Sequence, residues 1–267
     1  MTAHPLLVPA LQIAREAAAS LLHGFRTRPE SSEKGRNDLV TEFDLASETL
    51  LRERLGQLTP DIPILAEEEG GELGPELSWC CDPLDGTMNF VHGHPFFCVS
   101  VGLLNAGVPE LGIVVAPALA LEYAGGAGSP TTRNGEACSV SQISSVKESL
   151  LATGFPADRS VAPSNNLATF EYMLKRCHGV RRCGSAALDL CLVSDGTYDA
   201  YWERKLAAWD VAGGIALVEA AGGKVSHRSG GPLDISQGHI LASNGLVHEE
   251  MVQLLEQSLE SDSPSSS

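Results

Sequence analysis

The sequence predicts a layered α/β or α+β protein, because helical, strand-rich and mixed segments follow one another along its 267 residues. Apolar side chains recur at helical spacing in residues 9–26 and again before Pro60. From Phe96 to Tyr123 the chain is rich in strand-forming residues, and its turn signals predict an antiparallel meander. Helical and strand-like patterns then alternate, without an internal repeat.

Two helices are expected first. The helix at residues 9–26 is amphipathic, and a polar break separates it from a second helix that has Asp44 as its N-cap. Two short buried strands follow, at residues 62–66 and 76–81. The first strand runs into three consecutive glutamates and the second runs into Asp82. Both strands therefore deliver carboxylates at their C-terminal ends.

The second half of the chain alternates between the two kinds of element. Turn signals lie at Pro117 and at Asn134 followed by Gly135. Three further helices are expected at residues 163–178, 184–194 and 209–221, and one strand-like segment is expected at residues 197–203. The last seven residues, SDSPSSS, form a polar tail over 261–267 that is expected to be disordered.

The charge balance argues against some partners. Lys and Arg number 18 against 34 Asp and Glu, and the net charge of −16 disfavours binding to nucleic acid or an anionic membrane through a basic face. An anionic substrate would need bound divalent cations to reverse the local field. The N-terminus does not resemble a signal peptide, and no stretch approaches the roughly 20 apolar residues of a membrane span. We therefore expect a cytoplasmic protein whose seven cysteines are reduced thiols.

Residues 82–87, with the sequence DPLDGT, are the first candidate site. Pro83 stiffens the backbone, so that two carboxylates leave from one rigid turn, and Gly86 lets the backbone approach a ligand closely. A helix that begins at Thr87 would offer free N–H groups to an anion. Carboxylates beside an anion site make sense when cations lie between them, and Mg²⁺ prefers such hard oxygen ligands. Taken alone, Asp-Pro and Asp-Gly are also ordinary turn dipeptides.

Three further acidic segments favour a metal-binding site over a simple surface turn. They are KGRNDLVTEFD at residues 34–44, the pair Glu67 and Glu68 after a predicted strand, and Asp210 before a glycine-rich helix. Each lies at the boundary of a predicted element. Four acidic boundary segments in one chain are hard to attribute to chance.

The strings KGRNDLVTEFD, AEEE, DPLDGTMNF, GSAALDL and WDVAGGIALVEAAGG occur in the order found in the inositol monophosphatase family, which the chain resembles from about residue 9 to 257. The resemblance implies the layered αβαβα sandwich of inositol monophosphatases and fructose-1,6-bisphosphatases. It implies one domain over residues 1–260, with tightly packed halves of roughly 1–150 and 151–260. It also implies a lithium-sensitive, homodimeric phosphatase with two to three Mg²⁺ per subunit.

Carried over by position, the resemblance implies three sets of residues. The Mg²⁺ ligands would be Glu67, Asp82, the carbonyl of Leu84, Asp85 and Asp210. The catalytic residues would be Thr87, which orients the attacking water, Asp44, which accepts from its hydroxyl, and Glu67, which helps to deprotonate the water. The substrate contacts would be Asp85, Gly86, Thr87, Gly184, Ser185, Ala186, Glu203 and Asp210, with the N–H groups of Gly86 and Thr87 around the phosphate.

The expected reaction is metal-assisted hydrolysis of a small polyol phosphate, because divalent cations supply both a nucleophile at neutral pH and charge stabilisation. Asn89 in DGTMNF matches the inositol monophosphatase branch, so inositol 1-phosphate is the leading substrate. Fructose 1,6-bisphosphate and histidinol phosphate are alternatives. A non-catalytic binding protein of the same fold is a third hypothesis.

Several nearby residues have two interpretations. In the glutamate triplet, spacing favours the first residue as the ligand and places Glu69 on the solvated surface. Lys34 faces the phosphate or is a surface lysine, and Asp38 is expected only to brace its loop. Asp189 falls within a predicted helix, where a polar-face or capping role competes with a catalytic one.

Overall fold

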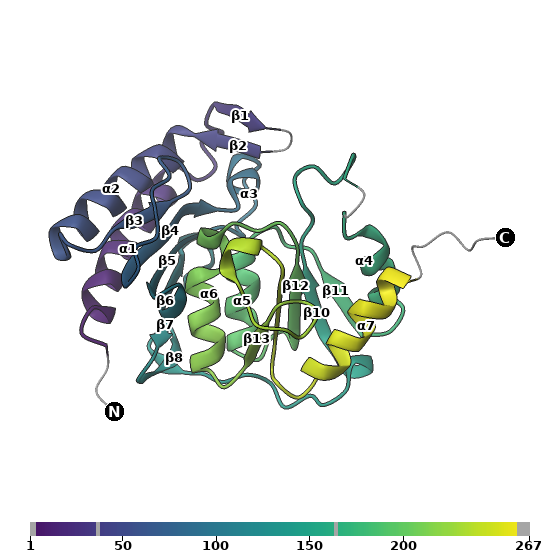
Figure 1. The fold of residues 1–267 in the computed structure, drawn as a ribbon. Coiled ribbons are helices and arrows are strands. Elements are labelled where there is room, and N and C mark those ends of the chain that lie inside the picture. The colour runs from purple at the N-terminus through teal and green to yellow at the C-terminus, as the bar shows by residue number, and fades with distance from the viewer. Residues whose placement is uncertain (1–3, 36–37, 163–164, 261–267) are drawn as a thin grey trace.

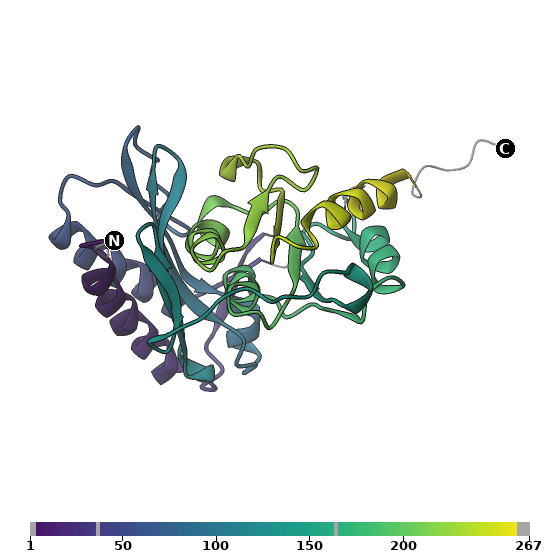
Figure 2. The same ribbon diagram turned by 90° about the horizontal axis from the view of Figure 1, so that it is seen from below.

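The computed structural model describes residues 4–35, 38–162 and 165–260, which form five alternating layers of helices and sheets (Figures 1 and 2). Figure 2 shows these layers edge-on, from the N-terminal helices through a larger sheet, two central helices and a smaller sheet to two outer helices. The predicted αβαβα sandwich is confirmed. The tail at residues 261–267 lies outside the described residues, so its predicted disorder stays a prediction.

The first layer consists of α1 (Leu7–Gly24) and α2 (Glu42–Leu58), and both helices were predicted. α2 starts with a capping box, in which the Thr41 hydroxyl accepts from the N–H of Phe43 and the Asp44 carboxylate accepts from the N–H of Thr41. The prediction of Asp44 as the N-cap was therefore wrong, because Asp44 is the third residue of the helix and caps it from within.

A hairpin of β1 (Ser31–Gly35) and β2 (Asp38–Thr41) precedes α2, where only a polar break was expected. All five residues of β1 are exposed, so the strand carries no apolar alternation by which it could be predicted. The side chain of Asp38 lies outside the described residues, and its bracing role remains a prediction.

The larger sheet has the strand order β3-β4-β5-β6-β7-β8-β9. Its strands are β3 (Ile64–Ala66), β4 (Leu77–Asp85), β5 (Cys98–Asn105), β6 (Val108–Ala116), β7 (Leu121–Gly126), β8 (Ser129–Arg133) and β9 (Glu136–Ala137). The antiparallel meander from β5 to β7 and the turn between β8 and β9 confirm the sequence prediction. The pairing of β4 with β5 is irregular between Asp82 and Asp85, so the predicted rigid turn is instead a bulge within a strand.

The central layer consists of α5 (Ala186–Ser194) and α6 (Ala208–Ala220), both predicted from the sequence. α6 packs on β5 and β6 through glycines. A Cβ atom added at Gly112 of β6 would lie 2.0 Å from the carbonyl oxygen of Gly213. Backbone therefore approaches backbone at this contact, which holds the start of α6 and its Asp210 close to the end of β4.

The smaller sheet has the strand order β11-β10-β12-β14-β13 and is covered on its outer face by two helices. Its strands and these helices are β10 (Leu150–Thr153), β11 (Gly179–Arg181), β12 (Ala200–Glu203), β13 (Lys224–Ser226), β14 (Ile240–Ser243), α4 (Leu167–Leu174) and α7 (His248–Glu260). β12 and α4 were predicted, although α4 is shorter than expected. A five-residue helix, α3 (Thr87–Val91), follows β4.

The seven cysteines are free thiols, four of them buried, as the sequence predicted. Among the residues that the structure describes, none of the helices has both the length and the apolar character needed to cross a membrane.

His248, the first residue of α7, makes the free energy of unfolding depend on pH. Its buried ring nitrogens lie 2.9 Å from Ser226 Oγ and 2.8 Å from Ser243 Oγ. Burial, together with the charge of Lys224, lowers the pKa of His248 to about 4, against a smaller opposing effect of Glu249. In an unfolded chain the imidazole has a pKa near 6.5. The stabilising contribution is therefore complete above pH 6.5 and is lost as the pH falls toward 4.

We expect the free energy of unfolding to fall by about 2 kcal/mol more in the wild type than in a His248→Asn variant when the pH is lowered from 7 to 5. Urea denaturation of both proteins at the two pH values measures this difference. Equal losses in the two proteins would contradict the assignment, and comparison with the variant removes the contribution of other titrating groups.

Candidate active site

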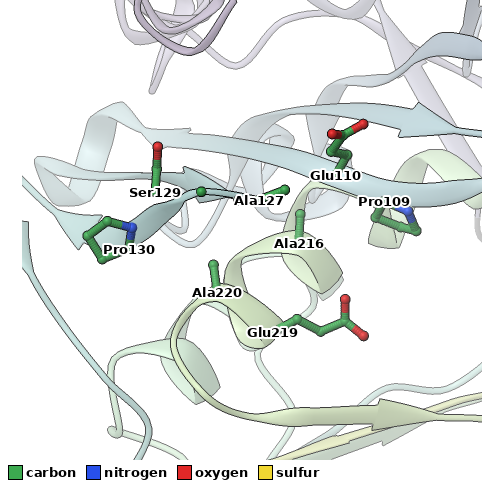
Figure 3. A pocket seen from close by; sticks show the side chains of 10 residues that line it. Pro109, Glu110, Ala127, Ser129, Pro130, Ala216, Glu219 and Ala220 are labelled. Atoms are coloured by element: carbon green, nitrogen blue, oxygen red, sulfur yellow. The ribbon is translucent and has the colours of Figure 1, made fainter. Parts of the chain in front are cut away.

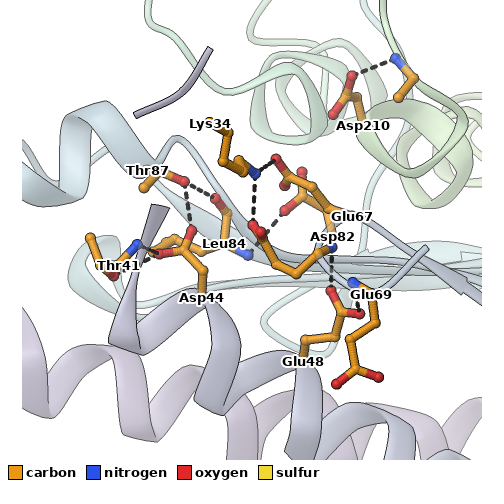
Figure 4. A network of polar contacts seen from close by, with 12 residues as sticks. Lys34, Thr41, Asp44, Glu48, Glu67, Glu69, Asp82, Leu84, Thr87 and Asp210 are labelled. Carbon is orange, nitrogen blue, oxygen red and sulfur yellow. Dashed lines mark hydrogen bonds and ion pairs between the residues drawn. The ribbon is translucent and has the colours of Figure 1, made fainter. Parts of the chain in front are cut away.

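Carboxylates from three layers meet where β3 and β4 end (Figure 4). Glu67 follows β3, Asp82 and Asp85 lie in the last part of β4, and Asp210 is in the first turn of α6. Burial raises the pKa of Asp82 well above its usual range, and the neighbouring charges of Glu67, Asp85 and Asp210 raise it further. The four predicted acidic ligands therefore share one electrostatic environment.

Asp44 reaches this cluster from α2. One of its oxygens accepts from both the N–H and the hydroxyl of Thr41, at 2.8 and 2.6 Å. The other accepts from the hydroxyl of Thr87 at 2.8 Å, and that hydroxyl also lies 3.0 Å from the carbonyl oxygen of Leu84. Because Asp44 caps α2 from within, its second oxygen is left to hold Thr87. The predicted pairing of Asp44 with Thr87 is present in the structure.

Asp85 is fixed by α5. Its Oδ2 atom accepts from the hydroxyl of Ser185 and from the N–H of Ala187, both at 2.7 Å. Burial raises the pKa of Asp85 to about 6, although these hydrogen bonds act in the opposite direction. Asp210 is held in a similar way, because it accepts from the N–H of Ala207 at 2.7 Å. Its pKa is raised well above the usual range, first by burial and then by Asp85.

Lys34 supplies a positive charge at the cluster. Its ammonium lies 2.7 Å from Glu67 and 2.8 Å from Glu68, so it is not a bare surface lysine. Its alternative role of facing the phosphate stays a prediction. Burial raises the pKa of Glu67 to about 7, while Lys34 acts to lower it. The carboxylate of Glu48 accepts from the backbone N–H groups of Glu68 and Glu69 and so fixes the triplet. Glu69 is exposed, as predicted.

A cavity of about 250 Å³ opens beside the cluster. Predicted substrate residues that line it are Asp85, Gly184, Ser185, Ala186, Glu203 and Asp210. Burial raises the pKa of Glu203 to about 7, and its carboxylate accepts from the Tyr201 hydroxyl. The two other predicted substrate residues, Gly86 and Thr87, line an adjoining cavity of about 270 Å³.

Asp189 was underestimated from the sequence. It is 2% exposed, lines the acidic cavity, and its Oδ1 atom has no hydrogen-bond partner among the described residues. It therefore neither caps α5 nor lies on a polar face. The signal was available, because Asp189 follows Ser185 by four residues and so shares its helix face.

The structure also contains a cavity of about 580 Å³ between the β7–β8 turn and the end of α6 (Figure 3). Its charged lining residues are Glu110 and Glu219, and its other lining residues are proline, glycine, alanine and serine. None of the predicted site residues lines it. These lining residues include no basic side chain and none of the predicted site residues, so the larger cavity is not the candidate active site.

The cluster fits a divalent cation by its donors. Among the described residues, no three His, Cys, Asp or Glu side chains are arranged to hold a metal ion as they stand. Lys34 supplies a positive charge at Glu67. All the available donors are carboxylate and carbonyl oxygens, which are the ligands of Mg²⁺ and similar ions. A bound cation would reverse the repulsion that raises their pKa values.

The fold is a layered α/β sandwich, and its site gathers carboxylates around a small polar cavity, where the carboxylate of Asp44 accepts from the hydroxyl of Thr87. This combination is typical of the phosphate-ester hydrolases. The sequence profile of the inositol monophosphatase family matches residues 2–260. The chain therefore belongs to the inositol monophosphatase family, as its motifs predicted, and it is a phosphomonoesterase.

Individual relatives agree with this assignment. The chain is 42% identical to the inositol-1-monophosphatase of Synechocystis sp. over 92% of its own length and 88% of that protein. It is 38% identical to a protein named Nus factor SuhB from Pseudomonas aeruginosa, over 90% and 92% of the two chains. The solved structure of an inositol monophosphatase from Anabaena superimposes with a TM-score of 0.87 at 42% identity, covering 94% of this chain and 95% of that one.

Proposed function

We propose that the protein hydrolyses a small polyol phosphate, with inositol 1-phosphate as the leading substrate, and that the reaction depends on Mg²⁺. The observation that carries this proposal is the convergence of four carboxylates, of which Asp82 and Asp85 are buried, with the paired side chains of Asp44 and Thr87. The name of the Synechocystis relative favours inositol 1-phosphate among the polyol phosphates.

The metal would be held by side chains that the fold already gathers. The proposed ligands are Glu67, Asp82, the carbonyl of Leu84, Asp85 and Asp210, which would accommodate two to three ions. When bound, Mg²⁺ supplies charge stabilisation and a water of lowered pKa. Asp85 would enter this role with its orientation set by Ser185 and by α5.

Thr87 and Glu67 would orient and deprotonate the attacking water. The Thr87 hydroxyl directs its proton toward Asp44 or the Leu84 carbonyl, which leaves its lone pairs to accept from a water. Glu67, which follows β3 beside Asp82, would accept the proton of that water. Together they would orient the nucleophile and remove its proton.

The substrate would extend across both cavities. The N–H groups of Gly86 and Thr87 would bind the phosphate, while Ser185, the backbone at Gly184 and Ala186, and Glu203 would contact the hydroxyls of the leaving group. Fructose 1,6-bisphosphate and histidinol phosphate could use the same site. We further propose a cytoplasmic homodimer inhibited by Li⁺, as the family resemblance implies.

Phosphate release from inositol 1-phosphate, fructose 1,6-bisphosphate, histidinol phosphate and 3′-phosphoadenosine 5′-phosphate, with and without Mg²⁺, tests this proposal. We expect Mg²⁺-dependent release that is fastest from one of the first three compounds, with inositol 1-phosphate favoured. Faster release from the nucleotide would contradict the assigned substrate class. Absence of release from all four compounds in Mg²⁺ would overturn the enzymatic proposal.

A further inference from the structure

Asp189 is a buried carboxylate that lacks a full set of hydrogen-bond partners. It is the one charged residue of α5, and it is 2% exposed. Its Oδ1 atom accepts no hydrogen bond from the residues that the structure describes. Removing a carboxylate from water costs free energy unless other hydrogen bonds replace those of the solvent. A ligand that enters the cavity beside Asp189 could supply the missing donor.

Glu203 on β12 is the acidic neighbour of Asp189. Both residues line the acidic cavity, and α5 packs against β12. Burial raises the pKa of Asp189 well above its usual range, and the charges of Glu203 and then Asp85 raise it further, while Arg182 acts in the opposite direction. Because an electrostatic effect falls with distance, these shifts place Asp189 and Glu203 close together in the cavity.

The adjoining cavity has the opposite charge. Its charged lining residues are Arg159 and Arg182, and it also contains Gly86 and Thr87, whose N–H groups are assigned to the phosphate. The two cavities share three lining residues, so they are continuous. A substrate that spans them would therefore meet positive charge around its phosphate and carboxylates around its leaving group.

We propose that Asp189 is a specificity-determining residue, which accepts hydrogen bonds from hydroxyl groups of the leaving group beside Glu203. This inference rests on the proposed function, and it adds Asp189 to the substrate residues that the family resemblance implies. A carboxyl group accepts hydrogen bonds in either protonation state. An analogue without hydroxyl groups would leave the buried oxygens of Asp189 unpaired, and a site of this kind rejects such an analogue strongly.

Inositol 1-phosphate and 4-nitrophenyl phosphate test this role, because only the first has hydroxyl groups on its leaving group. Asp189→Leu removes both oxygens at nearly constant side-chain volume. We expect it to lower kcat/KM for inositol 1-phosphate in Mg²⁺ at least about tenfold and to change kcat/KM for 4-nitrophenyl phosphate by less than about twofold, since a hydrogen bond to a carboxylate contributes on that scale. Asp189→Asn keeps one acceptor oxygen and should retain part of the activity that Asp189→Leu loses.

The melting temperature tests a purely structural role. Asp189→Leu should raise it by several degrees in the metal-free protein, because an apolar group replaces a buried carboxylate that lacks partners. Asp199→Asn is a matched control. Asp199 is also buried, but it accepts from the hydroxyl of Ser141 and the N–H of Leu150, and it lines neither cavity. This control should lower the melting temperature and leave the ratio of the two kcat/KM values unchanged.

A loss confined to inositol 1-phosphate supports the inference. Equal losses on both esters, or no loss on either, overturn it while the phosphatase function stands, and a lower melting temperature would then identify Asp189 as a structural residue. A loss confined to histidinol phosphate, measured in parallel, would mean that Asp189 pairs with an ammonium group, and that result also overturns it. If the wild type releases phosphate from none of these esters in Mg²⁺, the proposed function fails, and the inference fails with it.

Discussion

Replacement of Asp85 by asparagine is expected to lower phosphate release by at least about a hundredfold, because a preorganised charge at such a site contributes on that scale. The asparagine oxygen can still accept from Ser185 and Ala187, so the amide nitrogen would face the cavity where a cation ligand is needed. A steady-state assay with inositol 1-phosphate in Mg²⁺ measures the loss.

The same substitution should stabilise the metal-free protein. The pKa of Asp85 is raised by burial, which means that folding opposes its charge at neutral and higher pH. Removing that charge should raise the free energy of unfolding by about 1–3 kcal/mol at pH 8. Asp61→Asn is a matched control, since Asp61 is exposed on the loop before β3 and should change neither property. An active Asp85→Asn enzyme would remove Asp85 from the proposed ligand set.

Addition of Mg²⁺ is expected to raise the melting temperature of the wild type by about 5–10 °C at a hundredfold excess over its dissociation constant. The reason is that burial and mutual repulsion raise the pKa values of Asp82 and Asp210, and bound cations would neutralise these groups. Differential scanning fluorimetry before and after chelation measures the shift.

Two controls separate specific binding from general screening. NaCl at matched ionic strength should produce a much smaller shift, because buried charges are screened little by salt. Asp85→Asn should lose most of the Mg²⁺-dependent shift, although its melting temperature without metal should be higher than that of the wild type. Equal shifts in NaCl and in MgCl₂, or an undiminished shift in the variant, would contradict a metal site at these residues.

Much of the candidate site was predictable because its residues lie in short local motifs. Asp82 and Asp85 are three residues apart on one strand, and Asp210 begins a helix whose glycines allow close packing. The elements that carry them have strong apolar periodicity, so their type and order were also predictable. The hairpin that contains Lys34 was not, because exposed polar strands carry no such periodicity.

Other parts of the site depend on contacts between distant segments. Asp44 has the right spacing to cap α2, and only the fold shows that its second oxygen holds Thr87, 43 residues away. Asp189 became recognisable as a cavity residue once α5 was seen to be buried between two sheets. Arg159 lies in a segment without regular structure, so nothing in its local sequence relates it to Arg182.

The sequence by itself determined the family, the layered architecture and the set of candidate ligands, because short motifs and the spacing of apolar residues are properties of neighbouring residues in the chain. Only the tertiary structure decided how charge is distributed around that set. It placed Lys34 against Glu67 and Glu68, and it placed an arginine-lined cavity beside an acidic one. The physical reason is that electrostatic interaction depends on distance and burial in space, and both are set when separate layers pack together.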